Sequence, residues 1–282
     1  MSNTNDEAST LVEAIRTAER ILVIVGAGLS RPSGLPTFRE DPGFWGNRTT
    51  QVLTKSTFDV DPISVWCPFE RLRQLALLAL PNCGHIALAE LARAKPGVLT
   101  ISQNIDDLLR RAGHEESQLV DLHGPLFMIS CSHDACSFNS QNMDAAPTVP
   151  GLVIASWDAT DPSIVLPHLS SDDVPRCPCG SGILRPGVCW YGERLPKQAL
   201  QRINDWFESA TYVDLVLVVG TDRAPYLQEA EAAGADIAFF NISEDDLEAD
   251  MDAWIINDDA SNSLPALIGA ALGLHIRSTT AT

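Results

Sequence analysis

The chain has 282 residues, of which 45% are hydrophobic and 20% are charged, so it can build a sizeable core and is not intrinsically disordered. Nineteen Lys and Arg residues against 37 Asp and Glu residues give a formal net charge of −18 at pH 7. Such a charge repels phosphate backbones, which argues against direct nucleic-acid binding and favours a basic partner such as a lysine-rich peptide.

The longest apolar runs are far shorter than the roughly 20 residues of a membrane helix, so we expect no membrane association. The first residues lack the basic and apolar regions of a secretory signal. We therefore expect an intracellular, reducing location. Seven cysteines are an odd number for a disulfide framework, and metal binding is the better hypothesis for those that cluster.

The apolar pattern predicts alternating strands and helices. Residues 1–9 are polar and are predicted to be a loose tail, and residues 11–20 have helical spacing. Residues 21–25 form a continuous β-rich run that ends in glycines, which is typical of a parallel strand buried on both faces. Further strand-like runs lie at residues 98–102, 214–219, 235–240 and 253–256, and helical patterns at residues 65–80, 86–93, 105–111, 195–210 and 226–233. This order predicts an α/β fold with a doubly wound, Rossmann-like parallel sheet.

Two stretches interrupt the alternation. Residues 40–80 are mixed, with a helical pattern in their second half, and residues 128–190 are rich in Cys, Pro, Ser and Asp. We therefore predict one sheet domain with a smaller helical insert and a cysteine-bearing insert. The sheet domain comprises residues 10–39, 81–127 and 191–282, and the inserts are residues 40–80 and 128–190.

A glycine-rich loop follows the first predicted strand, with the sequence Gly26-Ala27-Gly28-Leu29-Ser30. Glycines allow backbone N–H groups to approach a phosphate closely. The spacing is not that of the usual dinucleotide fingerprint, because the third glycine would fall at Arg31. A tight turn without a ligand is the alternative.

Polar residues also follow the second predicted strand, as Gln103-Asn104-Ile105-Asp106. The carboxyl edge of an open α/β sheet is where ligands bind. The alternative is a helix N-terminus, capped by Asn104 and with Asp106 on the helix dipole. A lone histidine such as His123 is more often structural, but at the mouth of the same site it would serve as a general base.

Two short-spaced pairs of cysteines flank the insert, and they indicate a closed zinc site with four thiolate ligands, Cys131, Cys136, Cys177 and Cys179. Such a site would replace the apolar core that the insert lacks. Four unrelated thiols are the alternative, and His133 is a possible substitute ligand. The remaining cysteines, Cys67, Cys83 and Cys189, are expected to be ordinary buried thiols.

Together these segments resemble the sirtuin family, the NAD-dependent protein lysine deacylases. Residues 26–30 with residues 33–39 resemble its NAD-binding loop, residues 103–106 its nicotinamide and ribose motif, and residues 122–124 its catalytic-histidine motif. Residues 184–193 resemble the segment that grips the substrate peptide. Thr37, where most members carry Asp, and the wide first cysteine spacing resemble the class III, desuccinylase-like branch.

The resemblance implies NAD-dependent removal of acyl groups from protein lysine, giving nicotinamide and an O-acyl-ADP-ribose. It implies a structural zinc ion and a catalytic set of His123, Asn104 and Asp106. The implied NAD contacts are Gly26, Ala27, Gly28, Ser30, Phe38, Arg39, Gln103, Asn104, Ile105, Asp106, Gly220, Thr221, Asn241 and Ala260. The implied substrate contacts are Phe69, Leu72, Val188, Trp190, Tyr191, Gly192 and Glu193.

Three features depart from the family pattern. The class III branch reads acidic acyl groups with a Tyr and an Arg, and the matching positions here are Phe69 and Leu72. Bidentate recognition of a carboxylate is therefore lost, and an acetyl or apolar acyl group is the expected guest. The alternative is that Arg71 or Arg73 replaces the missing arginine through a shift of the helix register after Pro68. Asp222 stands where the family has Ser after Gly-Thr, and the segment after it is short. A protein that binds NAD or ADP-ribose with little turnover, and a mono-ADP-ribosyltransferase, are the alternative functions.

Overall fold

The computed structural model describes residues 3–37, 53–143, 146–152, 169–242 and 252–277. The chain divides into two compact units. Unit 1 comprises residues 1–34, 80–122 and 197–282, and unit 2 comprises residues 35–79 and 123–196. Each unit is built from segments that are far apart in the sequence.

Unit 1 contains a six-stranded sheet in the order β3-β2-β1-β7-β8-β9, and all its neighbouring strands are parallel. The strands are β1 (Ile21–Val25), β2 (Leu99–Ser102), β3 (Leu119–Asp121), β7 (Leu215–Val219), β8 (Asp236–Asn241) and β9 (Trp254–Asn257). This is the doubly wound Rossmann order, in which the chain reverses direction across the sheet between β1 and β7. The expected fold class is confirmed.

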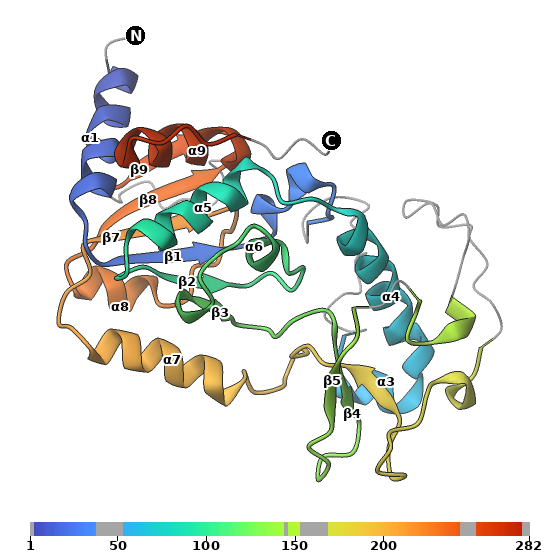
Figure 1. Cartoon of the computed structure of the whole chain (residues 1–282). Coiled ribbons are helices and arrows are strands. Elements are labelled where there is room, and N and C mark those ends of the chain that lie inside the picture. The colour runs from blue at the N-terminus through green and yellow to red at the C-terminus, as the bar shows by residue number, and fades with distance from the viewer. Residues whose placement is uncertain (1–2, 38–52, 144–145, 153–168, 243–251, 278–282) are drawn as a thin grey trace. The chain divides into compact units, whose positions relative to one another are not determined.

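Helices cover both faces of this sheet. They are α1 (Asn3–Thr17), α5 (Cys83–Ala94), α6 (Leu108–Arg111), α7 (Lys197–Glu208), α8 (Leu227–Ala232) and α9 (Ala260–Leu272), with 3₁₀ turns η1 (Ala27–Leu29), η2 (Arg31–Ser33) and η4 (Glu116–Gln118). Figure 1 shows α5 and α9 side by side over one face and α7 and α8 on the other. Every residue of β1 and β7 is buried, as expected for strands covered on both sides.

The structure corrects three expectations about helices. The polar residues 3–9 are not a loose tail, because they form the first turns of α1. Helix α6 is only four residues long, since Asp107 has a left-handed backbone (φ +66°) that cannot lie inside a helix. Helix α9 was not expected from its sequence, which contains Pro265 and Gly269, but Asp259 caps it by accepting from the Ser261 N–H.

Unit 2 combines a small antiparallel sheet with two helices. The sheet has the order β5-β4-β6, with β4 (Met128–Cys131), β5 (Asn139–Gln141) and β6 (Leu184–Pro186). The helices are α3 (Lys55–Val60) and α4 (Pro62–Leu78), and two 3₁₀ turns follow at η5 (Pro150–Leu152) and η6 (Ser171–Asp173). Helix α4 runs through Pro68 without ending there.

Among the described residues, no single helix is long and apolar enough to cross a membrane.

Candidate functional site

The glycine-rich loop lies where the strand order of the sheet reverses. Gly26 follows β1 and Gly220 follows the neighbouring β7, and the Gly28 N–H donates to the Gly220 carbonyl at 2.9 Å. A Cβ atom on Gly28 would lie 2.7 Å from the Gly220 Cα, and Gly220 itself has a left-handed backbone (φ +61°). The glycines therefore let two loops pack backbone to backbone at the carboxyl edge, which is the ligand-binding edge of such sheets.

Ser30 is the centre of a buried hydrogen-bond network beside this loop. Its hydroxyl lies 2.6 Å from Asp106 Oδ2, 3.2 Å from Asn104 Nδ2 and 3.3 Å from His85 Nε2. Asp106 Oδ1 accepts from the Leu108 N–H at 2.9 Å, at the first residue of the short helix α6, whose N-cap residue is Asp107 and not Asn104.

The direction of each proton in this network follows from the neighbours of His85. Its Nδ1 accepts from the Asn82 N–H, so in a neutral ring the proton is on Nε2, which faces Ser30. Burial lowers the pKa of His85 to about 3, which keeps the ring neutral. With Asn104 and His85 both donating to Ser30, the Ser30 hydroxyl proton points to Asp106.

Asp106 is buried, and this burial raises its pKa, while the hydrogen bonds from Ser30 and the Leu108 N–H oppose that shift. His85 and Asn82 were not among the residues expected from the sequence. The Asn82 side chain caps α5 in a reciprocal capping box with His85, and its Nδ2 donates to the Leu29 carbonyl at 2.8 Å. The Asn-x-x-His spacing before an apolar run is the only sequence signal that could have found them.

Asn104 and Gln103 join this network to both loops. Asn104 Nδ2 donates to the Gly26 carbonyl at 2.9 Å, and Gln103 Nε2 donates to the Arg223 carbonyl. The Thr221 hydroxyl lies 3.5 Å from Gln103 Oε1. In unit 1 the structure thus brings together the expected residues of the Gly26, Gln103 and Gly220 segments.

The other expected NAD contacts are less closely linked. Asn241 ends β8 opposite Asn257 of β9, and Ala260 is the buried first residue of α9. Phe38 and Arg39 lie outside the described residues.

His123 belongs to unit 2 and follows β3 by two residues. Its carbonyl accepts from the Cys189 N–H at 2.8 Å, and the next residue, Gly124, has a left-handed backbone (φ +77°). His123 is half-buried.

The expected peptide-binding segment is held in shape by Arg185. Its guanidinium donates to both carboxylate oxygens of Glu193, at 2.5 and 2.9 Å, and to the Val188 carbonyl at 3.0 Å, and it lies 3.4 Å over the Trp190 ring. Glu193 also accepts from the Trp190 N–H at 2.9 Å. Val188 and Trp190 are buried, whereas Tyr191 is 47% exposed next to Gly192, which has a left-handed backbone.

Phe69 and Leu72 lie on α4, and both are buried. The guanidinium of the nearby Arg73 already has other partners. It ion-pairs with the buried Glu70 at 3.3 Å and donates to the carbonyls of Asn142 and Ala146. Arg73 is therefore not available to read a carboxylate.

The four expected zinc ligands form one cluster, in which all four sulfur atoms lie within 4.8 Å of one another. Cys131 and Cys179 Sγ are 3.7 Å apart, and Cys136 and Cys177 Sγ are 3.9 Å apart. Four sulfurs at about 2.3 Å from a tetrahedral zinc would be about 3.8 Å from each other. Two of the sulfur pairs therefore already have the separation that a tetrahedral zinc requires, and the His133 backbone N–H donates to Cys131 Sγ.

Backbone N–H groups support the cluster from outside. The Ser181 N–H lies 3.4 Å from Cys179 Sγ, and this hydrogen bond, together with those of the neighbouring thiols, lowers the pKa of Cys179 to about 6. Of the other cysteines only Cys67 is buried, with a pKa raised by burial to about 11, while Cys83 and Cys189 are half-buried. The expectation that all three are buried was wrong for the last two.

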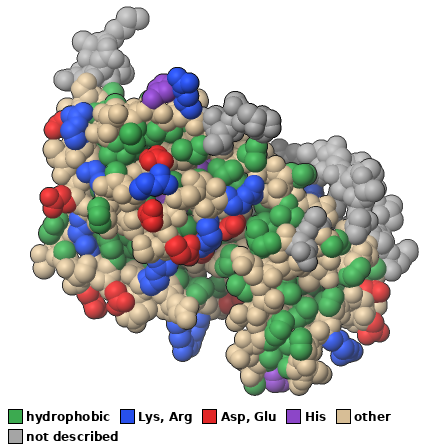
Figure 2. Space-filling model, viewed as in Figure 1, with side chains coloured by type: hydrophobic (Ala, Val, Ile, Leu, Met, Phe, Trp, Pro, Cys, Tyr) green, Lys and Arg blue, Asp and Glu red, His purple; other side chains and the backbone are tan. Residues whose placement is uncertain are grey.

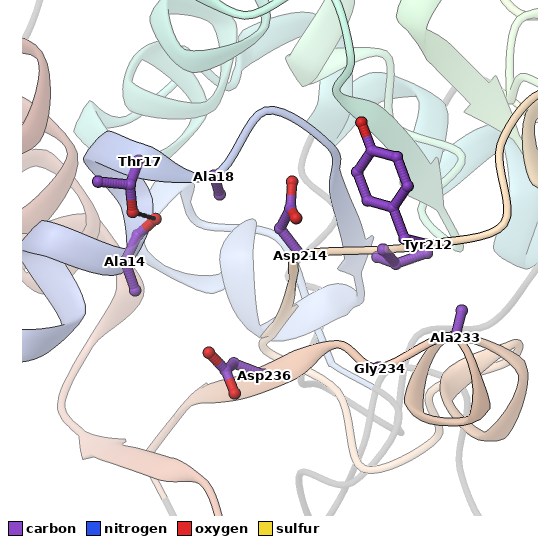
Figure 3. Close-up of a pocket in the computed structure, with 9 residues that line it drawn as sticks. Ala14, Thr17, Ala18, Tyr212, Asp214, Ala233, Gly234 and Asp236 are labelled. Atoms are coloured by element: carbon purple, nitrogen blue, oxygen red, sulfur yellow. Dashed lines mark hydrogen bonds between the residues drawn. The ribbon is translucent and has the colours of Figure 1, made fainter.

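A hollow of about 360 Å³ lies at the opposite, amino-terminal edge of the sheet in unit 1 (Figure 3). It is lined by Tyr212, Asp214 and Asp236 together with small residues of α1 and α8–β8. None of the expected site residues line it.

The fold and the site define a class of protein that has a doubly wound, Rossmann-like domain and a second unit with a four-cysteine cluster suited to zinc. Residues 26–224 match the Sir2 family model. An NAD-dependent protein deacylase of Candida albicans is 32% identical over 95% of this chain and 99% of its own length. The mitochondrial NAD-dependent protein deacylase sirtuin-5 of Canis lupus familiaris is 36% identical over 80% of this chain and 73% of its own.

Among solved structures, a Sir2 homologue in complex with NAD superposes with a TM-score of 0.75 at 28% identity, covering 94% of each chain. A Sir2 homologue F159A mutant in complex with ADP ribose gives the same TM-score at 27% identity, over 94% of this chain and 96% of the other. The chain therefore belongs to the Sir2 family, the sirtuins.

Proposed function

We propose that this chain removes acyl groups from protein lysine in an NAD-dependent reaction, and that His123, Asn104 and Asp106 carry it. The relatives that share most of its length are named as NAD-dependent protein deacylases. The observation that carries the proposal is the network at the carboxyl edge, in which Ser30 joins Asp106 to Asn104 beside the glycine loop.

When bound, NAD would supply a ribose carbon as the acceptor for the acyl oxygen, with nicotinamide as the leaving group. Asn104 and Asp106 hold the nicotinamide end, with Ser30 and His85 fixing their positions. His123 acts as the general base for a ribose hydroxyl. The Gly26–Gly28 segment carries the diphosphate, because glycines leave its backbone N–H groups open to a close approach.

The products test this function against its two alternatives. The protein is incubated with NAD and a panel of acetyl-, butyryl-, myristoyl- and succinyl-lysine peptides, and the mixture is analysed by mass spectrometry. Deacylation gives free nicotinamide with an O-acyl-ADP-ribose. ADP-ribose attached to the acceptor would instead show transferase activity, and NAD binding without products would show a binding protein.

We further propose that the acyl group is acetyl or another apolar chain. Phe69 and Leu72 offer no hydrogen-bond donor or charge to a carboxylate, and Arg73 is occupied by Glu70 and two backbone carbonyls. A succinyl group would lose its hydration without a partner for its charge.

Restoring the missing donors should switch this preference. In the double variant Phe69→Tyr, Leu72→Arg, we expect the ratio of kcat/KM for succinyl- over acetyl-lysine peptides to rise roughly 10- to 100-fold, since a hydrogen bond to a charged group contributes about 1.5–3 kcal/mol. Leu78→Arg is the matched control, because it adds the same charge at a position of α4 that is 83% exposed. A wild-type enzyme that prefers succinyl-lysine would contradict the proposal.

The substrate that we propose is a basic acyl-lysine protein or peptide. The net charge of −18 attracts such a peptide over a distance. On the face that Figure 2 shows, acidic and basic side chains lie among one another, so this attraction comes from the whole molecule and not from one acidic patch on that face.

Asp222 is exposed beside Thr221 and adds a negative charge where we place the adenosine half of NAD. We expect Asp222→Ser to lower the KM for NAD about two- to fivefold at low salt, because one repulsive charge at an exposed site is worth up to about 1 kcal/mol. The gain should shrink as salt screens the charge. Asp236→Ser, which removes an exposed carboxylate at the opposite edge of the sheet, should leave the KM for NAD unchanged.

A further inference from the structure

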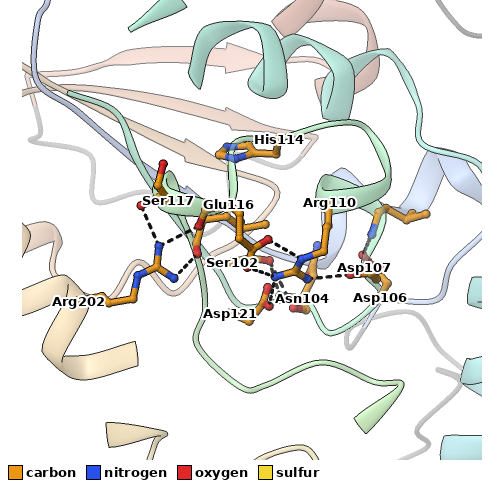
Figure 4. Close-up of polar contacts among 12 residues, drawn as sticks. Ser102, Asn104, Asp106, Asp107, Arg110, His114, Glu116, Ser117, Asp121 and Arg202 are labelled. Atoms are coloured by element: carbon orange, nitrogen blue, oxygen red, sulfur yellow. Dashed lines mark hydrogen bonds and ion pairs between the residues drawn. The ribbon is translucent and has the colours of Figure 1, made fainter. Parts of the chain in front are cut away.

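Arg110 is the hub of an ion-pair network in unit 1 (Figure 4). Its Nη1 lies 2.7 Å from Asp107 Oδ1, its Nε lies 2.7 Å from Glu116 Oε2, and its Nη2 lies 2.9 Å from both Glu116 Oε1 and Asp121 Oδ2. One guanidinium therefore holds three carboxylates from three different segments, a geometry that its planar fork allows and a lysine cannot reproduce.

Two of these carboxylates stand next to residues of the proposed active site. Asp107 follows the buried Asp106 and has a left-handed backbone (φ +66°), a conformation unusual for a residue other than glycine. Asp121 is the last residue of β3, after which the chain runs through Leu122 to His123. The Leu122 N–H donates to the Ser102 carbonyl at 2.8 Å, which ties this exit point to the end of β2.

Arg110 also balances charge that would otherwise be costly to bury. The Asp107 side chain is 8% exposed and that of Asp121 is 19% exposed. Burial raises the pKa of Asp121, and Arg110 opposes this shift, whereas Glu116 and Asp107 add to it. Removing the guanidinium would leave these carboxylates as neighbours without their shared cation.

The other charged groups around the network do not replace Arg110. Arg202 of α7 donates to the backbone carbonyls of Glu116, Ser117 and Leu119, as Figure 4 shows for the first two. His114 is buried and lies 2.9 Å from the Thr100 hydroxyl through its Nε2, and burial lowers the pKa of its ring. Among the described residues, Arg110 is the cation that ion-pairs with both Asp107 and Asp121.

We propose that Arg110 is a positioning residue for deacylation, which holds the turn after Asp106 against the end of β3. It thereby fixes the position of the loop that we propose binds nicotinamide, and the position of the end of β3, from which the chain leads to His123. The inference rests on the proposed function of those two residues. Arg110 touches neither substrate nor NAD in this role. Its effect is to keep the two segments in one geometry, and small displacements of such segments carry large rate penalties.

The test compares Arg110→Gln and Arg110→Lys with Arg93→Gln. Arg93 is the matched control, because it is an arginine of unit 1 that ion-pairs with Glu90 and Glu115 and donates to the Gly113 carbonyl, but pairs with none of the three carboxylates that Arg110 holds; its side chain is 50% exposed. For each zinc-loaded protein we measure the melting temperature and the NAD dissociation constant. We also measure kcat and KM for an acetyl-lysine peptide between about pH 5.5 and pH 9, because the pH profile reports the pKa values of the essential groups.

For Arg110→Gln we expect kcat to fall roughly 10- to 100-fold while the KM for the peptide stays within about twofold, the pattern of lost positioning. The acidic limb of the pH profile should move to higher pH, because Asp121 without Arg110 takes up its proton more readily. Arg110→Lys keeps a positive charge, so it should restore the acidic limb but only part of kcat.

Equal kcat and pH profiles for Arg110→Gln and Arg93→Gln, with only the melting temperature lowered, would overturn the proposal. If Arg110→Gln fails to fold, the proposal is tested with Arg110→Lys and Asp121→Asn instead. A wild-type kcat in both variants would reject the positioning role of Arg110. If the wild type binds NAD but shows no deacylation, the proposed function fails by itself. The positioning role is then judged by the NAD dissociation constant, which should be about tenfold higher in Arg110→Gln than in Arg93→Gln.

Discussion

His123→Ala is expected to lower kcat for deacylation by roughly 10²- to 10⁴-fold, the range that a positioned general base contributes. The KM for NAD should change little, because the residues that hold NAD in our proposal lie in other segments. Initial rates with an acetyl-lysine peptide, measured by nicotinamide release and by mass spectrometry of the O-acyl product, check this result.

His275→Ala is the matched control for this loss, because His275 is an exposed histidine after α9 and far along the chain from the site residues. It should keep wild-type rates. Equal melting temperatures and zinc contents would show that His123→Ala is folded. Unchanged deacylation in His123→Ala would refute the general-base role, whatever the behaviour of the control.

Cys177→Ser is expected to abolish zinc binding and to unfold the sheet of unit 2 that the cysteines hold. The cluster joins residues from β4 to the segment before β6, and Cys131 and Cys179 are 48 residues apart in the sequence. Since structural zinc supplies most of the folding free energy of such modules, amide exchange in residues 128–142 and 174–189 should become faster by more than about a hundredfold.

In the same exchange experiment unit 1 serves as an internal reference, because the backbone amides of β1 and β7 should stay protected from exchange. Cys83→Ser is the control for the loss of a thiol, because Cys83 starts α5 in unit 1 and lies outside the cluster. It should retain one zinc per chain by metal analysis. A Cys177→Ser protein that keeps its zinc and its exchange protection would refute the four-thiolate site.

The buried parallel strands were the easiest elements to predict. Residues 21–25 and 214–219 are unbroken apolar runs, and β1 and β7 lie within them, because a strand covered on both faces needs apolar residues at every position. The strands of unit 2 gave no such signal. All three residues of β5, Asn139–Gln141, are polar and exposed, so no periodicity marks them.

The segments of the candidate site could be predicted where their residues are close together in the sequence. Three motifs are each recognisable within a few residues: the glycine loop, the Gln103–Asp106 segment and the two cysteine pairs. Their order along the chain indicated the sirtuin family. His85 gave no comparable signal, because its role depends on Ser30, which is 55 residues away in the chain. A lone histidine at the start of a helix does not reveal its partner.

The sequence by itself determined the parallel sheet, the family and the thiol ligand set, because continuous burial, glycine turns and close ligand spacing are written in neighbouring residues. Only the tertiary structure decided where the protons and charges lie. Ser30 points its proton at Asp106, 76 residues further on, and Arg110 gathers carboxylates of three segments, because both contacts exist only once distant loops meet at the edge of the sheet.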